Sequence, residues 1–405
     1  MGPDRCKNEH RAASAPPATV PPIASMTLPV AVLTDQDLRI ALGRKTIMVT
    51  GGAGFIGVAV CRLLHELSDC RIVNLDKLSY ASNPEALRGL ADDARYTFEH
   101  ADIIDPAALT RIFRQHQPDA VIHLAAESHV DRSIDGPQAF VANNVIGTLH
   151  LLEACRAHLQ EHNAAERAGF RILHVSTDEV YGSLEDGGLF DERSAYDPRS
   201  PYSASKAASD HLASAWQHTY GLPTITTNCG NNYGPFQFPE KFIPTLIIRA
   251  LKGQTLPIYG GGDQVRDWIH VEDHARALLG VLARGQVGGK YLIGAEEPRR
   301  NLEIAELVCD LVDRVVPRNA SSRSLIAHVA DRPGHDRRYA IDSAHARAEI
   351  GWRPTRSLQA GLEATVRWYV ERKDWWEEIF RSGRYDGERL GLAAQNKELG
   401  TAARR

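Results

Sequence analysis

Short runs of apolar and β-branched residues alternate with amphipathic stretches from Lys45 onward. The apolar runs lie at 46–50, 71–75, 96–99, 120–124, 171–175 and 224–227, with helical periodicity in segments between them. Strands that alternate with helices favour right-handed βαβ units. The pattern therefore predicts an α/β fold built on a doubly wound parallel sheet.

The alternation becomes irregular after residue 234. Residues 235–269 and 290–345 are rich in Pro, Gly and Arg. This change indicates a smaller C-terminal substrate-binding lobe that is interleaved with strands returning to the sheet. We expect the large domain to span 44–234 with returning segments at 257–292, and the lobe to occupy mainly 235–392.

Both ends of the chain differ from the rest. Residues 1–43 are rich in Ala and Pro, have no strand or helix periodicity, and lack the apolar core of a signal peptide. Such a segment gains too little from burial to offset the entropy of ordering, so we predict a disordered extension at 1–43 and a flexible tail at 393–405. Deleting residues 1–41 should then leave folding almost unchanged, and Met26 is an alternative start.

Composition excludes several classes of function. Charged residues make up 24% of the chain and the formal net charge is −4, so a general affinity for nucleic acid is not expected. The six cysteines are scattered, without CxxC pairs or His clusters at metal-ligand spacing, which predicts reduced thiols, a cytoplasmic location and no metal site. No apolar run approaches the roughly 20 residues that span a membrane.

A glycine-rich turn follows the first predicted strand. Gly51, Gly54 and Gly57 precede a helix with GxxGxxG spacing, and the missing Cβ atoms let the backbone approach a pyrophosphate at the helix N-terminus. Asp76 ends the second strand about 20 residues later, where an acidic side chain binds ribose hydroxyls and repels a 2′-phosphate. This arrangement predicts a Rossmann-type domain that prefers NAD to NADP.

Residues after the third and fourth strands extend the predicted cofactor site. Asp102 and Ile103 follow the third strand, where a polar–apolar pair could flank an adenine. The run 124–128 ends the fourth strand with small residues that let a cofactor lie close.

Tyr202 and Lys206 form a Tyr-x-x-x-Lys pair, and their i, i+4 spacing places both on one face of a helix. An ammonium beside a phenol favours the tyrosinate, so we expect a lowered pKa for Tyr202 and a role as base for a substrate hydroxyl. The motif occurs in many helices by chance, and its weight comes from its combination with the glycine turn.

Two carboxylates follow the fifth strand. Asp178 and Glu179 come directly after Thr177, at the edge where open α/β sheets bind ligands. Removing water across C5 and C6 of a hexose needs a base for the C5 proton and an acid for the C6 hydroxyl, once C4 has been oxidised to a ketone. Two carboxyls with separated pKa values could supply both roles, and a solvated loop is the alternative.

Together these segments resemble the extended short-chain dehydrogenase/reductase family and, more narrowly, the dTDP-glucose 4,6-dehydratases. The similarity runs from about residue 45 to 392. Its specific marks are LDKLSY at 75–80, AAESHVDRS at 125–133, STDEVYG at 176–182, NNYGP at 231–235, RDW at 266–268 and DRPGHDRR at 331–338. The Asp-Glu pair is the mark that indicates dehydration.

The resemblance implies NAD as cofactor and a dTDP-linked hexose as substrate. Thr177 would bind the C4 hydroxyl while Tyr202, beside Lys206, takes its proton. Glu179 would remove the C5 proton and Asp178 would protonate the leaving C6 hydroxyl. The implied cofactor-binding residues are Gly51, Gly54, Phe55, Ile56, Gly57, Asp76, Lys77, Leu78, Ser79, Asp102, Ile103, Leu124, Ala125, Ala126, Ser128, Asn143, Tyr202, Lys206 and Asn232. The implied substrate-binding residues are Ser128, Thr177, Asn231, Lys241, Pro257, Tyr259, Arg266, Asn301, Asp331, Arg332 and His335.

Two positions depart from the family pattern. Gly230 replaces a Ser, which could loosen the turn, and Asn143 replaces a Thr that commonly touches the cofactor. The resemblance also implies a homodimer, formed by the Tyr202 helix and a helix at 144–157. The alternatives are another NAD-dependent nucleotide-sugar dehydratase, a 4-epimerase or a decarboxylase of the same fold, or a non-catalytic NAD-binding regulator.

Overall fold

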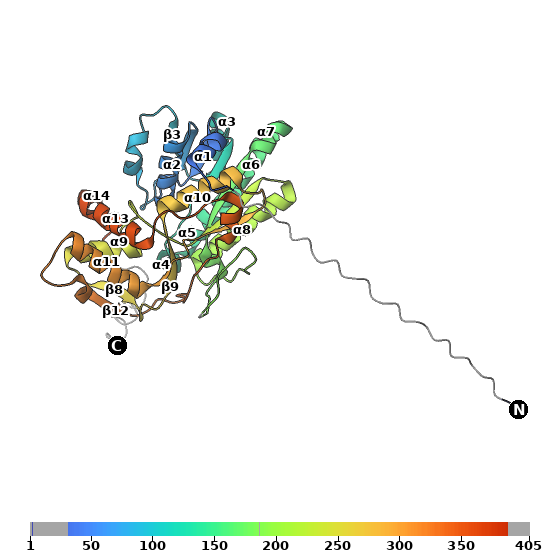
Figure 1. Ribbon diagram of the computed structural model, residues 1–405. Coiled ribbons are helices and arrows are strands. Elements are labelled where there is room, and N and C mark those ends of the chain that lie inside the picture. Colours follow the sequence, from blue (N-terminus) through green and yellow to red (C-terminus); the bar gives the residue numbers. More distant parts are fainter. Residues whose placement is uncertain (1, 3–30, 186, 388–405) are drawn as a thin grey trace, which may run out of the picture.

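The computed structural model describes residue 2 and residues 31–185 and 187–387. A large domain surrounds a seven-stranded sheet, and a smaller lobe lies beside it (Figure 1). The strands are β1 (Thr46–Thr50), β2 (Arg71–Asp76), β3 (Tyr96–His100), β4 (Ala120–His123), β5 (Arg171–Thr177), β6 (Thr224–Cys229), β7 (Asn231–Tyr233), β8 (Leu256–Tyr259), β9 (Val265–His270), β10 (Lys290–Ile293), β11 (Pro298–Arg300) and β12 (Ile326–Val329).

The α-helices are α1 (Asp35–Leu42), α2 (Phe55–Leu67), α3 (Pro106–His116), α4 (Val130–Asp135), α5 (Pro137–Phe140), α6 (Thr148–Gln160), α7 (Ala164–Gly169), α8 (Pro201–Tyr220), α9 (Phe242–Lys252), α10 (Val271–Arg284), α11 (Asn301–Val315), α12 (Ala344–Ile350), α13 (Leu358–Glu371) and α14 (Lys373–Arg381). Shorter helical turns are η1 (Pro84–Leu90), η2 (Val141–Gly147), η3 (Asp178–Tyr181) and η4 (Ser322–Leu325); η2 is a π-helix and the others are 3₁₀.

The large sheet is parallel throughout, in the order β10-β6-β5-β4-β1-β2-β3. The chain reverses its direction across the sheet between β3 and β4, so a ligand crevice forms at the carboxyl ends of β1 and β4. The predicted α/β class and doubly wound sheet are confirmed. Each predicted apolar run coincides with one of the strands β1 to β6 within two residues at either end.

Apolar side chains cover both faces of this sheet. On one face α2 and α10 pack together, with Leu64 and Leu278 in a shared core (Figure 1). On the other face α3 and α6 contribute Ile112 and Leu151 to a second core. Burying an aliphatic side chain stabilises the fold by about 1.5–3 kcal/mol, so these layers fix the strand ends that carry the site.

The smaller lobe has a core of its own. Helices α9, α11, α13 and α14 pack with the parallel pair β8 and β12, burying Leu246, Val308 and Trp376. The expected return of 257–292 to the large domain is only partly right. β8 stays in the lobe because Ile258 belongs to its core, and the segments that return are α10 and β10.

The expected disorder of residues 1–43 is wrong from Thr34 onward. Thr34 caps α1 in a capping box with Asp37, and Leu38 and Leu42 are fully buried against the α2/α10 layer. Arg284 on α10 forms a 2.9 Å ion pair with Asp37. The expectation for residues 3–30 and for the tail at 393–405 lies outside the described residues. Among the described helices, none is both long and apolar enough to cross a membrane.

Candidate active site

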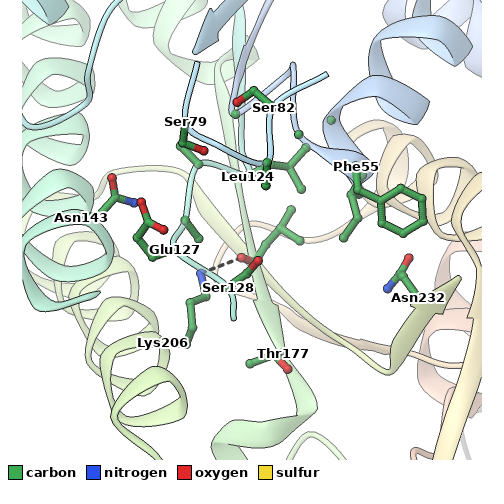
Figure 2. A pocket seen from close by; sticks show the side chains of 18 of the residues that line it. Phe55, Ser79, Ser82, Leu124, Glu127, Ser128, Asn143, Thr177, Lys206 and Asn232 are labelled. Atoms are coloured by element: carbon green, nitrogen blue, oxygen red, sulfur yellow. Dashed lines mark hydrogen bonds between the residues drawn. The ribbon is translucent and has the colours of Figure 1, made fainter. Parts of the chain in front are cut away.

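The carboxyl ends of the central strands surround a cavity of about 300 Å³ (Figure 2). It brings together residues that lie far apart in the sequence, from the glycine turn to the start of α9. The predicted site residues that line it are Gly51, Gly54, Phe55, Ile56, Gly57, Asp76, Lys77, Ser79, Asp102, Ile103, Leu124, Ala125, Ala126, Ser128, Asn143, Thr177, Asp178, Glu179, Tyr202, Lys206, Asn231, Asn232 and Lys241.

The glycine turn fits a pyrophosphate. Gly51 has a φ of +72°, and a Cβ on Gly57 would lie 2.1 Å from the Gly51 carbonyl oxygen, so neither position tolerates a side chain. Helix α2 starts after Gly54 without a side-chain cap. Because no side chain caps the first turn, its N–H groups remain for an anionic ligand, and the helix dipole favours that charge.

Asp76 organises the turn that faces this helix. Its carboxylate accepts hydrogen bonds from the N–H groups of Ala53 at 3.0 Å and Leu78 at 2.8 Å, and from the Ser82 hydroxyl at 3.0 Å. Leu78 does not line the cavity. Its backbone adopts a φ of +55° and the residue is 38% exposed, which leaves the expected cofactor contact without support.

Lys77 lies in a cluster of oxygen acceptors. Its ammonium donates to Asn143 Oδ1 at 2.8 Å and forms ion pairs with Glu127 at 3.3 Å and Asp102 at 3.8 Å. Figure 2 shows Asn143 and Glu127 beside each other at this wall. The Asn143 amide oxygen therefore accepts a hydrogen bond from Lys77, and this contact gives the departure from the family pattern a local structural role.

Close packing explains why a glycine occupies position 230. A Cβ at this position would lie 2.8 Å from the Asp267 carbonyl oxygen. The side chain of Asn232 donates to the Gly230 carbonyl oxygen at 3.0 Å and accepts from His274 at 2.9 Å. The turn is therefore hydrogen-bonded, and the expectation that Gly230 loosens it is not supported.

The reacting groups come from two elements. Thr177 ends β5, and Asp178 and Glu179 begin η3 directly after it. Tyr202 and Lys206 lie on α8, whose first turn is fixed by a capping box at Ser200 and by Pro201. The Lys206 ammonium donates to the Val175 carbonyl oxygen at 2.9 Å (Figure 2).

The carboxyls of Asp178 and Glu179 differ in how readily they ionise. Burial, strengthened by the neighbouring Glu179, raises the pKa of Asp178 well above its usual value. Burial also raises the pKa of Glu179, but Arg332 and Arg266 oppose that rise. Asp178 thus favours the protonated form of an acid, and Glu179 is the carboxyl of the two that ionises more readily.

The expected lowering of the Tyr202 pKa is not found. Burial, together with the negative charge of Glu179, raises the pKa of the phenol well above its usual value. Desolvation also lowers the pKa of Lys206, although Asp210 opposes this effect. The spacing of Tyr202 and Lys206 predicts an ammonium that favours the tyrosinate. It carries no information on the free-energy cost of ionising a buried phenol beside a carboxylate.

A second group of predicted residues does not line the cavity. These are Pro257, Tyr259, Arg266, Asn301, Asp331, Arg332 and His335, which come from the smaller lobe. The Arg332 guanidinium pairs with Asp131 at 2.8 Å, and His335 Nδ1 pairs with Asp331 at 2.6 Å. Arg266 is buried and donates to the backbone oxygens of Val265 and Asp336, so it is engaged within the protein.

Sequence reasoning missed several side chains of the site. Glu127 lines the cavity and Asp131 holds Arg332, and both lie in the run 125–133 that carried the resemblance. Glu240 lines the cavity too, and it accepts a 2.6 Å hydrogen bond from Tyr80. Only the family motif could have indicated the first two, because charge alone does not distinguish a buried carboxylate from a solvated one.

The comparisons with known proteins agree with this geometry. A family described as GDP-mannose 4,6 dehydratase matches residues 48–365. A dTDP-glucose 4,6-dehydratase of Shigella flexneri is 54% identical over 348 residues, which cover 84% of this chain and 96% of the relative. The chain belongs to the dTDP-glucose 4,6-dehydratase family. The family description names a GDP-linked sugar and the relative a dTDP-linked one, as expected where one family spans several nucleotide-sugar enzymes.

Solved structures place family members on the same fold. DesIV from Streptomyces venezuelae, a dTDP-glucose 4,6-dehydratase with NAD and TYD bound, has a TM-score of 0.76 and 44% identity, covering 82% of this chain and 99% of that one. A UDP-glucose 4-epimerase of Thermus thermophilus in complex with NAD has a TM-score of 0.70 but only 29% identity, covering 80% and 99%. The epimerase alternative thus shares the fold with lower sequence similarity.

Proposed function

We propose that this chain is an NAD-dependent dTDP-glucose 4,6-dehydratase that forms dTDP-4-keto-6-deoxyglucose and water. One observation carries the proposal: two adjacent carboxyls, the buried Asp178 and the partly buried Glu179, share one cavity with Tyr202 and Lys206. A 4-epimerase needs the tyrosine and lysine but has no use for an acid and a base at C5 and C6. The names of the similar proteins support the dTDP-linked substrate.

Each reacting group has one task. Tyr202 removes the proton of the C4 hydroxyl, which Thr177 orients. When bound, NAD⁺ supplies an acceptor for the C4 hydride and adds positive charge to the cavity, and its reduced form later reduces C6, so that no cofactor is consumed. The ketone at C4 acidifies C5, and Glu179 then removes the C5 proton. Asp178 donates its proton to the departing C6 hydroxyl, which leaves as water, and Glu179 returns its proton to C5 when hydride is delivered to C6.

The residues present fit this cofactor. The turn at Gly51 and Gly57 cannot hold a side chain, and the start of α2 has no side-chain cap, as an NAD pyrophosphate requires. Asp76 lines the same cavity and places a carboxylate where a 2′-phosphate would be repelled. These features support a preference for NAD over NADP.

Mass detection tests the proposed function directly. The protein is incubated with NAD and, separately, with dTDP-, UDP- and GDP-linked glucose. We expect loss of one water from the dTDP-linked sugar. A product of unchanged mass that chromatography separates from the substrate would instead indicate an epimerase, and recovery of only the starting sugar nucleotides would refute both activities.

The assembly expected from the resemblance is a homodimer. Helices α6 and α8 contact each other, and the exposed apolar side chains of Val141, Ile146 and Tyr220 lie on η2 and α8. A two-fold contact through these helices would cover that surface. Sedimentation velocity should give a dimer that Ile146→Glu weakens, whereas a stable wild-type monomer at micromolar concentration would refute it.

A further inference from the structure

Lys206 is buried without a direct ionic partner. Only 4% of the residue is exposed, and its ammonium donates to the Val175 carbonyl oxygen. Within the described part of the chain no carboxylate pairs directly with it. A buried ammonium is costly unless negative charge lies near it, so the fold must supply that charge from farther away.

Asp210 is placed to supply this charge. It lies one helical turn after Lys206 on α8, and only 3% of it is exposed. His174 Nε2 lies 2.9 Å from one of its carboxylate oxygens. The Tyr196 hydroxyl at 2.8 Å and the Asn228 amide at 3.1 Å donate to the other.

These contacts keep the Asp210 carboxyl ionised. Burial favours its neutral form, but the hydrogen bond from His174 and the charge of Lys206 outweigh burial and lower its pKa. Desolvation, with the charge of Lys206, lowers the pKa of His174. His174 is therefore neutral near pH 7, and its Nε2–H is the donor to Asp210.

The other groups around this pair leave Asp210 as the compensating anion. His123 on β4, His174 on β5 and Cys229 on β6 interact electrostatically with Lys206, and Tyr202 on α8 and Asp178 and Glu179 on η3 line the same cavity as Lys206. Tyr181, Tyr196 and Lys290 interact with Asp210, and Glu192 interacts with Tyr181 and Lys290. Burial lowers the pKa of His123 and raises that of Cys229 to about 12, so both are neutral. Lys290 is a second cation near Asp210, and its charge also helps to keep the carboxyl ionised.

We propose that Asp210 is a positioning residue for this reaction, whose carboxylate keeps Lys206 charged and so maintains Tyr202 as a base. Asp210 acts through Lys206 and lies outside the cavity that holds the reacting groups. Without the charge of Asp210, burial would lower the pKa of Lys206 further and leave a neutral amine beside a phenol whose pKa is already raised. The pair would then rest as neutral amine and phenol, a state with the same number of protons and no base.

A double-mutant cycle tests this inference, which rests on the proposed function. In the wild-type background Asp210→Asn should lower kcat roughly 10- to 100-fold with little change in KM, a part of the worth of a positioned base. In a Lys206→Met background it should lower kcat less than about 3-fold, since the residue through which it acts is gone. Equal losses in both backgrounds would overturn the proposal.

The ultraviolet band of tyrosinate gives a second readout. The NAD-loaded wild type should develop this band from Tyr202 as pH rises, identified by its absence in Tyr202→Phe. Asp210→Asn should lose the band, whereas Tyr196→Phe, which removes one donor but leaves the charge, should keep it. A band that persists in Asp210→Asn would overturn the proposal.

A charge-conserving variant distinguishes the loss of the Asp210 charge from a general loss of folding. If Asp210→Asn does not fold, Asp210→Glu retains the charge on a longer side chain and should keep the band. Loss of the band in a folded Asp210→Glu protein would contradict the proposal. Failure of the proposed function would be distinguishable, because the wild type would then release no water from dTDP-glucose.

Discussion

Asp131 and Arg332 form a 2.8 Å ion pair across 201 positions of the sequence. Asp131 lies on α4 of the large domain, and Arg332 lies in a loop after β12 of the smaller lobe. The Tyr259 hydroxyl donates to the other Asp131 carboxylate oxygen at 2.9 Å. One buried carboxylate thus fixes two side chains that the resemblance assigns to substrate binding.

Asp131→Asn should therefore weaken substrate binding. A lost hydrogen bond to a charged group costs about 1.5–3 kcal/mol, so we expect KM to rise roughly 10- to 100-fold. kcat should change little, because Asp131 does not contact the reacting groups. Steady-state kinetics check this. Asp135→Asn, the same charge change at an exposed position of α4, is the control and should leave KM unchanged.

Helix α1 should contribute to stability. Leu38 is fully buried, and Leu38→Ala should lower the free energy of unfolding by about 2–5 kcal/mol. Ile40 on the same helix is 72% exposed, so Ile40→Ala should change it by less than about 0.5 kcal/mol. Denaturant unfolding measures both, and equal effects would show that α1 does not pack as described.

Truncations separate α1 from the residues before it. Removing residues 1–43 should lower the unfolding midpoint because it also removes the buried Leu42 and the Asp37–Arg284 ion pair. Removing residues 1–30 leaves these contacts in place and should have a smaller effect. A harmless longer deletion would show that α1 adds nothing to the stability of the large domain.

The large sheet could be predicted from the sequence because its strands are buried on both faces and therefore consist of continuous apolar runs. Helix α1 was missed because it is short and shows only two buried apolar positions, Leu38 and Leu42, after a Pro-rich segment. The place of β8 was missed for a different reason. Its partner, β12, begins at Ile326, about 70 residues later, and local pattern carries no information on such pairing.

The candidate site was predictable wherever a motif fixes the local backbone. Gly51, Gly57 and Asp76 follow from turn geometry, and the spacing of Tyr202 and Lys206 follows from the helix. The electrostatics were not predictable. Whether a phenol beside a lysine is ionised depends on burial and on carboxylates from another element, here η3, and these are properties of the assembled fold.

Acid should destabilise the protein through its buried histidines. Burial lowers the pKa of His274 to about 3, against about 6.5 in an unfolded chain. Below about pH 6.5 the unfolded state therefore binds a proton that the native state does not, and stability falls by about 1.4 kcal/mol per pH unit from this one group. His274→Gln should flatten the pH dependence of unfolding, whereas His218→Gln at an exposed position should not.

Replacing Glu179 and replacing Asp178 should block different steps of the reaction. With Glu179→Gln the C4 oxidation remains possible because Thr177, Tyr202 and Lys206 are intact, but elimination stalls for lack of a base at C5. Reduced nicotinamide should then accumulate, visible by its absorbance, and solvent deuterium should not enter C5 of recovered sugar. With Asp178→Asn expulsion of the C6 hydroxyl is slowed, and deuterium can still enter C5 if elimination is stepwise.

Each of these substitutions should lower turnover on the order of 10²–10⁴-fold, the usual worth of a positioned acid or base. The raised pKa of Asp178 adds a condition, since an acid that holds its proton above its usual pH range should sustain activity at neutral pH. Asp178→Glu should therefore retain more activity than Asp178→Asn, because only the former can donate a proton. Near-normal turnover in both Glu179→Gln and Asp178→Asn would refute the acid–base assignment and favour the epimerase alternative.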